Sequence, residues 1–270
     1  MTRPKAGLYI VSTPIGNLGD VSPRALETLA QADVVACEDT RVGAKLLSHF
    51  GIKAPKIFPV HDHNESVRSA EIVKLIEGGS SVVLVSDSGT PVISDPGFKV
   101  ARAVADAGLY MTAVPGACAA INALVLSALP SDKFSFAGFA PRGRNELAEF
   151  FAEMRGTTIF YESPVRLTAT LSSLAKVAPD AHVAVAREMT KMFEEVVRGT
   201  SAEVAEHFLK HAPRGEIVVV VSKGENKPVE NWKKFAKMFR SKLSAKDAAE
   251  LMSKAFGASK KEIYDYIVQI

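Results

Sequence analysis

The chain has 270 residues, of which 47% are hydrophobic and 23% are charged, and its formal net charge is +3. This composition is typical of a globular protein and excludes disordered, collagen-like and disulfide-stapled chains. The two cysteines form neither a CxxC pair nor another metal-binding pattern, so we expect no metal site. A short apolar run near the N-terminus is broken by Pro14, and no segment reaches the ~20 apolar residues of a membrane helix. We therefore expect a cytoplasmic protein without a membrane partner.

Short apolar runs alternate with amphipathic stretches along the first 224 residues. The runs predicted as strands are Leu8–Ser12, Val34–Cys37, Val82–Ser86, Met111–Val114, Phe134–Gly138, Thr158–Tyr161, His182–Arg187 and Ile217–Ser222. The stretches predicted as helices are 66–77, 98–107, 117–129, 147–154, 165–177 and 202–211. Several runs are continuously β-branched, as in strands that are covered on both faces. The alternation predicts an α/β fold with largely parallel strand pairing.

Two breaks divide this pattern into three parts. Leu129-Pro130-Ser131-Asp132 resembles a linker, and Lys223 to Pro228 forms a second break after the last predicted strand. We therefore predict an N-terminal α/β domain over residues 1–128, a C-terminal α/β domain over 129–224 and a basic helical tail over 225–270.

The tail holds the excess positive charge. It has ten Lys or Arg against six Asp or Glu, a balance of +4, whereas the other 224 residues sum to −1. Ser244 opens a predicted helix that Gly257 closes, and the capping box Ser259 to Glu262 opens the next. These two helices resemble a helix-turn-helix unit. The unit is either a solubilising cap or a surface that binds RNA phosphates.

A strand over 82–86 leads directly into a segment, Ser86–Gly97, that is rich in Ser, Asp, Gly and Pro. Ligands in parallel α/β sheets bind beyond the carboxyl ends of the strands, and a loop of this length is more often functional than a plain connection. Gly89 permits a close approach to the main chain. Similar loops follow the strands at 8–12 and 111–114. Because neither GxGxxG nor GxxxxGK[ST] occurs, classical dinucleotide and P-loop sites are disfavoured.

Charged residues follow three other strands. Glu38, Asp39 and Arg41 come after one of them, Glu162 after another and Lys191 shortly after a third. They are candidates for proton transfer, and the alternative for the first group is an ordinary helix N-terminus favoured by the dipole. His61 to Glu65 has possible metal-ligand spacing, but a polar turn explains the segment better. Arg142 and Arg144 form either a solvated turn or a grip on phosphates.

At these motifs the chain resembles the ribosomal RNA small-subunit methyltransferase I family, in the class III, tetrapyrrole-methylase-like group of S-adenosylmethionine enzymes. The resemblance rests on the segments GLYIVSTPIGNLGDVSPRALETLAQADVVACEDTR, SDSGTPVISDPG, VPGACAAINAL, FYESPVR and RGEIVVVVSKG, in that order. It implies two α/β domains with S-adenosylmethionine in the cleft between them, and commonly a homodimer. It also implies 2′-O-methylation of a cytidine ribose in the decoding region of 16S rRNA, with 16S rRNA or the small ribosomal subunit as partner. One departure is the loop 139–144, Phe-Ala-Pro-Arg-Gly-Arg, where the family usually has Phe-Leu-Pro-Arg-Lys.

Carried over by position, the resemblance also names the residues expected to contact the cofactor. They are Ile15, Asp87, Gly89, Thr90, Ile93, Ala117, Cys118, Tyr161, Arg187, Glu188, Gly215, Glu216 and Ile217. A ribose hydroxyl is a poor nucleophile, so a positioned base or cation should assist its deprotonation. The sequence does not choose among Glu38, Asp39, Arg41, Glu162 and Lys191 for this role.

Two other functions compete with RNA methylation. The first is methylation of a small tetrapyrrole, which the basic tail disfavours because such a substrate needs no cationic module. The second is RNA binding without catalysis on a degenerate cofactor fold, which the intact Ser86–Gly97 loop disfavours.

Overall fold

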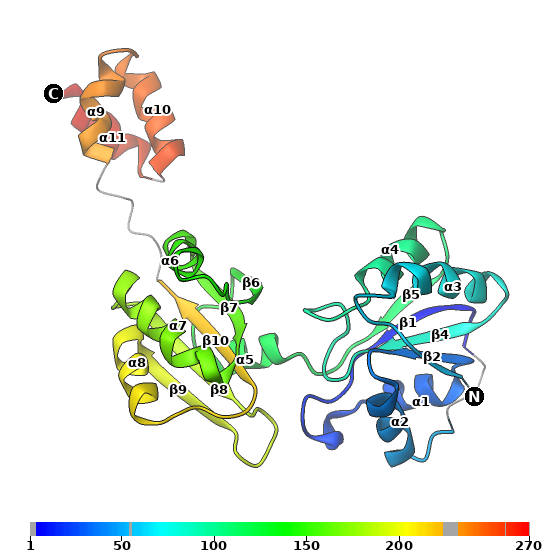
Figure 1. Cartoon of the computed structure of the whole chain (residues 1–270). Helices are drawn as coiled ribbons and strands as arrows, with labels where there is room; N and C mark the ends of the chain where they lie inside the picture. Colours follow the sequence, from blue (N-terminus) through cyan, green and yellow to red (C-terminus); the bar gives the residue numbers. More distant parts are fainter. Residues whose placement is uncertain (1–3, 54–55, 224–231, 257, 270) are drawn as a thin grey trace. The chain divides into compact units, whose positions relative to one another are not determined.

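The computed structural model of the chain describes residues 4–53, 56–223, 232–256 and 258–269 (Figure 1). The chain forms two compact units, Met1–Ser222 and Lys223–Ile270, and each is described by itself. Among the described residues, no helix is both long and apolar enough to cross a bilayer.

The first sheet of the larger unit has the strand order β3-β2-β4-β1-β5, and all its pairings are parallel. Its strands are β1 (Gly7–Val11), β2 (Val34–Cys37), β3 (Ile57–Pro59), β4 (Ser81–Val85) and β5 (Met111–Val114). Because all five strands run in one direction, their carboxyl ends lie at the same end of the sheet. This agrees with the parallel pairing predicted from the sequence.

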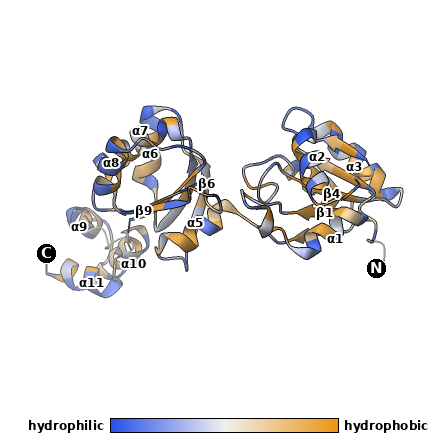
Figure 2. Cartoon of the chain, turned by 90° about the horizontal axis from the view of Figure 1, so that it is seen from below, coloured by the Kyte–Doolittle hydropathy of each residue, from blue (hydrophilic) through white to orange (hydrophobic). Residues whose placement is uncertain are grey.

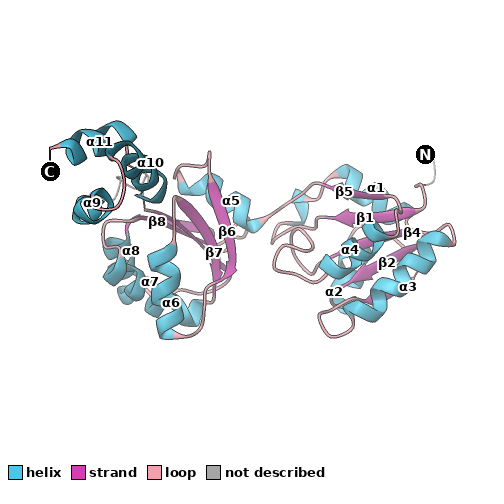
Figure 3. Ribbon diagram, turned by 90° about the horizontal axis from the view of Figure 1, so that it is seen from above, coloured by secondary structure: helices cyan, strands magenta, loops and turns pink. Residues whose placement is uncertain are grey.

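Helices cover both faces of this sheet (Figure 3). Val82 and Leu84 point to one face, where they pack with the helices α3 (Glu65–Glu77) and α4 (Phe98–Asp106). The alternate residues Val83 and Val85 pack on the other face with α1 (Pro23–Gln31) and α2 (Thr40–His49). Two-sided burial explains why these strands lack the apolar–polar alternation of a half-exposed sheet.

The second sheet has the order β6-β7-β10-β8-β9. Its strands are β6 (Phe134–Phe139), β7 (Thr157–Glu162), β8 (His182–Arg187), β9 (Glu195–Thr200) and β10 (Ile217–Ser222). One face packs against α6 (Arg144–Glu153), α7 (Pro164–Val177) and α8 (Ser201–Lys210). The other packs against α5 (Ala119–Ser127), which is apolar on nearly all sides (Figure 2). Thus α5 packs with the second sheet although it precedes the predicted boundary at residues 128/129, and that boundary stays a prediction.

The expectation of largely parallel pairing is wrong for this second sheet. Only β6–β7 is parallel, whereas β7–β10, β10–β8 and β8–β9 are antiparallel. The cause is β9, which the sequence pattern did not reveal. It follows β8 after a turn too short for a crossover and reverses the direction of the chain, so that β10 runs opposite to β8. The other elements that the pattern missed are β3, α1 and α2.

The antiparallel pairing brings sequence-distant ends together. Ile217, at the start of β10, lies opposite Glu162 at the end of β7 and Arg187 at the end of β8. In a parallel sheet, the start of β10 would lie at the opposite end from the ends of β7 and β8. Here all three lie at the same end of the sheet.

The smaller unit consists of α9 (Trp232–Arg240), α10 (Ala245–Phe256) and α11 (Lys260–Val268) around a core of its own. The predicted N-cap is confirmed, because the Ser259 side chain accepts a hydrogen bond from the Glu262 amide, which is one of the two bonds of a capping box. The sequence analysis did not single out α9. The predicted break at 224–228 and the predicted helix stop at Gly257 lie outside the described residues.

Candidate active site

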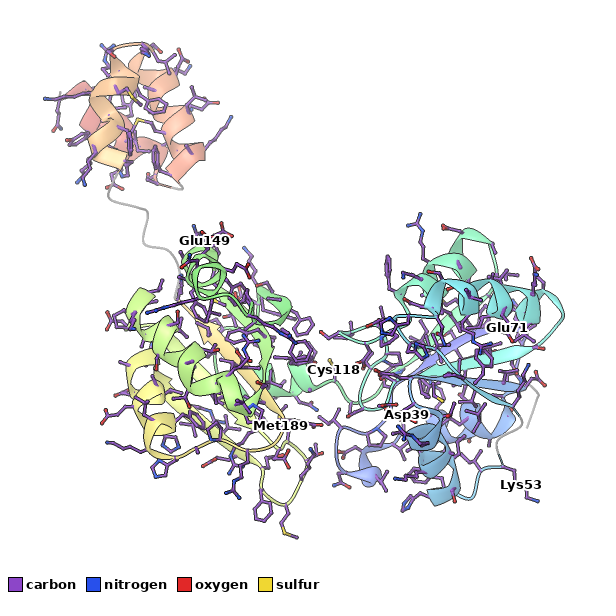
Figure 4. The ribbon with its side chains drawn as sticks, in the orientation of Figure 1. Asp39, Lys53, Glu71, Cys118, Glu149 and Met189 are labelled. Carbon is purple, nitrogen blue, oxygen red and sulfur yellow. The ribbon has the colours of Figure 1, made fainter. Side chains whose placement is uncertain are left out.

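A pocket of about 320 Å³ lies within the larger unit, lined by loops from both of its sheets. Pockets of this size hold small ligands and cofactors. Nine of the residues expected to contact the cofactor line it: Ile15, Gly89, Thr90, Ile93, Cys118, Tyr161, Gly215, Glu216 and Ile217. The last three reach it because the start of β10 lies beside the ends of β7 and β8. Cys118, just before α5, and Met189, just after β8, are labelled in Figure 4.

The loop Ser86–Gly97 has an unusual backbone. Val92 (φ 77°) and Ser94 (φ 63°) lie in the left-handed region, as do Gly89 (φ 83°) and Gly97 (φ 126°). A β-branched residue there is a real outlier, and each non-glycine residue costs ~1–3 kcal/mol that the surrounding structure must offset.

Hydrogen bonds from neighbouring strand ends hold the first half of this loop. The Thr13 amide donates to the Gly89 carbonyl at 2.8 Å. The Thr90 hydroxyl donates to the Ala117 carbonyl at 2.9 Å and lies 3.0 Å from the Ser12 hydroxyl. The loops after β1, β4 and β5 are thereby joined into one pocket wall.

A buried carboxylate holds the far end of the loop. Oε1 of Glu65 accepts from the Gly97 and Lys99 amides, each at 2.8 Å, and so caps α4 from another helix. The preceding turn is closed by Asn64, whose side chain accepts from the His61 amide and donates to the Pro59 carbonyl. The segment 61–65 is therefore a structural turn, as predicted. Within the described part of the chain, no three His, Cys, Asp or Glu residues are grouped for a metal.

Aromatic side chains form the pocket wall contributed by the second sheet. The Tyr161 ring lies edge-on to Phe136 (centroids 5.0 Å apart) and to Phe139 (5.5 Å). Burial raises the pKa of Tyr161 to about 12, so its hydroxyl stays protonated at neutral pH. Gly89 also lines the pocket, and it leaves no room for a side chain, since a Cβ there would meet Ile15 Cγ2 at 3.2 Å.

Four of the expected cofactor contacts do not line this pocket. Asp87 accepts from the Asp39 amide at 3.0 Å and faces a separate cavity. The Ala117 carbonyl bonds to Thr90, and Arg187 pairs with Glu195 at 2.6 Å. Glu188 Oε1 accepts from the Glu216 amide and from Lys191 Nζ, each at 3.0 Å. Ala117 and Glu188 adjoin the pocket through Thr90 and Glu216, which line it, whereas the partners of Asp87 and Arg187 do not. Contact of these four residues with a cofactor stays a prediction.

Asp39 and Arg41 are mainly engaged with each other. Asp39 is the N-cap of α2 (Figure 4), where its carboxylate accepts from the Arg41 amide at 2.8 Å and pairs with the Arg41 guanidinium at 2.5 Å. These bonds lower the pKa of Asp39 to about 2. So weakly basic a carboxylate is a poor proton acceptor.

Glu38 lies in different surroundings at the end of β2. Partial burial raises its pKa, and the nearby charges of Asp87, Asp95 and Asp62 raise it further. A carboxylate whose pKa moves toward neutrality becomes a better general base.

Glu162 is buried, and both of its carboxylate oxygens have hydrogen-bond or ion-pair partners. Its side chain is 1% exposed, accepts from the Thr170 hydroxyl at 2.6 Å and the Ser163 amide at 2.7 Å, and lies 3.2 Å from Arg166 Nη2. Arg166 also donates to the carbonyls of Ala140 and Pro141. Glu162 thus connects the pocket wall to the basic loop at 139–144.

Asp95 is a pocket residue that the sequence analysis missed. It is half-buried in the pocket wall, and burial followed by the Asp87 charge raises its pKa although the Ser86 hydroxyl donates to it. The feature of the sequence that could have identified Asp95 as a pocket residue is its position six residues beyond Gly89 in the same loop. The other lining residues not predicted are Ser88, Ala119, Phe139, Ser163, Pro164, Met189 and Val218.

Known proteins share this fold and sequence. A family model described as tetrapyrrole (corrin/porphyrin) methylases matches residues 7–205. A protein of Haemophilus influenzae named "Ribosomal RNA small subunit methyltransferase I" is 42% identical, with 98% of each chain covered. One of the same name from Rickettsia prowazekii is 40% identical, over 97% of this chain and 96% of that protein. The chain belongs to the ribosomal RNA small subunit methyltransferase I family, within the tetrapyrrole methylases. It is therefore a methyltransferase whose cofactor is S-adenosylmethionine.

Solved structures confirm the fold. Uroporphyrin-III C-methyltransferase from Thermus thermophilus, complexed with S-adenosyl homocysteine, superposes with a TM-score of 0.53 at 20% identity, covering 80% of this chain and 97% of that one. The methyltransferase CobJ superposes with a TM-score of 0.59 at 18% identity, covering 80% and 94%.

Proposed function

We propose that the chain transfers the methyl group of S-adenosylmethionine to the 2′-hydroxyl of a cytidine ribose in the decoding region of 16S rRNA, as free RNA or in the small ribosomal subunit. The observation that carries the proposal is the match, over 98% of both chains, to a protein named for small-subunit rRNA methylation. That match includes the helical unit as well as the pocket, whereas the tetrapyrrole methylase model ends at residue 205.

The pocket fits this cofactor in size and chemistry. Ile15, Met189 and Val218 supply apolar walls for an adenine ring, while Asp95 supplies a carboxylate for a cationic group. Gly89 and Gly215 line the pocket without side chains, and a Cβ would press against Ile15 at the first position and overlap Glu188 at the second. We propose that these residues, with the other predicted contacts, hold S-adenosylmethionine.

The bound cofactor supplies an electrophilic methyl group, and the chain must supply orientation and an acceptor for the ribose proton. Among Glu38, Asp39, Arg41 and Glu162, we propose Glu38 as that acceptor. Its carboxylate has a raised pKa, whereas Asp39 has a lowered one and Glu162 is enclosed by donors. Arg41 is exposed and paired to Asp39.

A direct test uses tritiated S-adenosylmethionine with purified small subunits, free 16S rRNA and a uroporphyrinoid as alternative acceptors. We expect label in one of the RNA samples, released on nuclease digestion as 2′-O-methylcytidine. Label on a nucleobase, or on the tetrapyrrole alone, would contradict the proposal.

We also propose a cytoplasmic homodimer, because ribosomal subunits are cytoplasmic in bacteria and the sequence resemblance implies pairing. Light scattering of the full chain, expected to give twice the 28.9 kDa chain mass, tests the oligomeric state.

A further inference from the structure

The positive charge of the smaller unit is concentrated on one helix. α9 carries Lys233, Lys234, Lys237 and Arg240 and no acidic residue. By contrast, the segment from α10 to α11 holds four Lys and four Asp or Glu and sums to zero. Almost all the net charge of the described residues 232–256 and 258–269 therefore lies on α9 and on Lys242 just after it.

In the helix-turn-helix-like pair, whose charges sum to zero, one carboxylate binds two of the four lysines. Glu250 lies 3.2 Å from Lys254 Nζ and 2.7 Å from Lys260 Nζ. These hydrogen bonds lower the pKa of Glu250 to about 2, so the carboxylate stays charged in any ordinary buffer. Lys254 and Lys260 are thereby occupied within the unit.

In the described part of this unit, the α9 cations have no such carboxylate partners. Lys233 lies over the Tyr266 ring at 5.7 Å, and Arg240 donates to the Leu243 carbonyl. Within the described residues, none of the four α9 cations has a carboxylate in ion-pair distance, and Lys234 and Lys237 are exposed to solvent. Their charge is available to a ligand.

The buried residues and the charged residues of α9 lie on different faces of the helix. Trp232 and Ala236, one turn apart, are buried in the core of the unit. Lys233, Lys237 and Arg240 follow the spacing i, i+4, i+7 and form a stripe on the solvent side. On the other side of the helix, Phe235 is 40% exposed and stacks on Phe256 with centroids 5.4 Å apart.

We propose that α9, and not the α10–α11 pair, binds the phosphate backbone of the RNA substrate, with Lys234, Lys237 and Arg240 as phosphate contacts. The inference rests on the proposed function, which makes RNA the substrate. Unpaired cations gain most from phosphates, because each contact releases counterions from the RNA. The exposed Phe235 adds a face on which a base can stack.

The structure favours RNA over a lipid surface. A helix that lies in a membrane inserts its apolar face, and here Trp232 and Ala236 on that face are buried inside the unit. Most of the residues that α9 exposes to solvent are charged.

The test compares two variants of the full chain that lose equal charge. One is the triple change Lys234→Gln, Lys237→Gln and Arg240→Gln. The matched control, on the α10–α11 pair, is Lys246→Gln, Lys254→Gln and Lys261→Gln. Affinity for a decoding-region RNA fragment is measured from 50 to 300 mM salt, with S-adenosylmethionine affinity measured by calorimetry in parallel.

For the α9 variant we expect at least tenfold weaker RNA binding at low salt and a salt slope reduced by about two, because each lost phosphate contact removes ~0.7–0.9 from the slope. S-adenosylmethionine binding should persist, and the control should bind RNA within about twofold of the parent. Lys234→Arg with Lys237→Arg should retain affinity, which separates loss of charge from loss of folding.

Equal weakening in the two Gln variants would overturn the assignment to α9, and so would an unchanged α9 variant. Binding to anionic phosphatidylserine vesicles that is lost in the α9 variant while RNA binding persists would point to a membrane and overturn it too. The proposed function is tested separately by methylation with the parent chain. A parent that methylates no RNA refutes that function whatever the binding data show.

Discussion

A glutamate lies at the carboxyl end of both β2 and β7, but the two side chains have different surroundings: Glu38 directly follows β2 in the first sheet, and Glu162 is the last residue of β7 in the second. Glu162 is 1% exposed and receives hydrogen bonds from a hydroxyl and an amide beside an arginine. Glu38 is half-buried, and the charges that act on it come from other carboxylates. The first environment stabilises a fixed negative charge, whereas the second raises the affinity of the carboxylate for a proton.

The comparison teaches that a residue type at a strand end does not define a role. The charge partners decide the role, and they come from a sequence-distant loop for Glu38 and from the following helix for Glu162. Asp87 and Asp95 reach Glu38 from the loop after β4, while Thr170 and Arg166 reach Glu162 from α7. We therefore expect Glu38 to act in chemistry and Glu162 in architecture.

The largest expected effect is on turnover. Glu38→Gln should lower the single-turnover methylation rate by about 10²–10⁴-fold, the usual contribution of a general base, while S-adenosylmethionine affinity persists. Asp39→Asn is the matched control, because Asp39 is adjacent but bonded to Arg41. If the Glu38→Gln enzyme methylated RNA at the parent rate, Glu38 would not be the base, and the contrast between Glu38 and Glu162 would fail.

The next effect concerns the cofactor. In Gly89→Val, the new Cβ would meet Ile15 Cγ2 at 3.2 Å and fill the pocket wall, so we expect at least tenfold weaker S-adenosylmethionine binding, about 1.4 kcal/mol. Gly79→Val is the control, since Gly79 also has a positive φ (91°) but nothing lies within 4 Å of its Cβ position. Calorimetry showing equal affinities for the two folded variants would contradict a cofactor role for this loop.

A smaller effect should appear in stability. Glu162→Gln removes the charge that pairs with Arg166 but keeps an acceptor for Thr170, so we expect a loss of ~1–2 kcal/mol in the free energy of unfolding. The methylation rate per folded molecule should stay within a few-fold of the parent. A hundredfold loss of rate with an unchanged melting temperature would instead make Glu162 the base.

The smallest effect is on the pH dependence of stability, where Glu38 and Asp39 should act with opposite sign. The pKa of Asp39 is lowered to about 2 by Arg41, so its ionised form stabilises the fold above about pH 4 and that contribution disappears as the pH falls toward 2. The pKa of Glu38 is raised by burial and by acidic neighbours. Ionisation of Glu38 therefore lowers the stability of the fold as the pH rises through this raised pKa.

Melting temperatures of two variants measure this contrast. At pH 7, Glu38→Gln should melt above the parent and Asp39→Asn below it. Both differences should shrink as the pH falls, for Glu38→Gln once the glutamate of the parent protonates and for Asp39→Asn between pH 4 and 2. Two shifts of the same sign would show that the adjacent carboxylates share one environment.

Much of the site could be anticipated from local pattern. The loop Ser86–Gly97 was recognisable because a buried strand runs into turn-forming residues, and Gly89, Thr90 and Ile93 do line the pocket. Asp95 was missed, since nothing local distinguishes it from Asp87 in the same loop. Only the folded loop turns Asp95 into the pocket and Asp87 toward the Asp39 amide.

By itself, the sequence determined the local elements of this protein: the period of its buried strands, the N-cap of α11 at Ser259 and the excess of cations in the tail. These features depend on neighbours within a few residues. The tertiary structure decided what depends on distant partners. The β8–β9 hairpin reversed the second sheet and so brought Gly215–Ile217 to the pocket. The ion pairs of Glu250 engage Lys254 and Lys260, whereas no carboxylate among the described residues pairs with the α9 cations. Strand direction and charge neutralisation are set by contacts between segments, and a linear pattern does not contain those contacts.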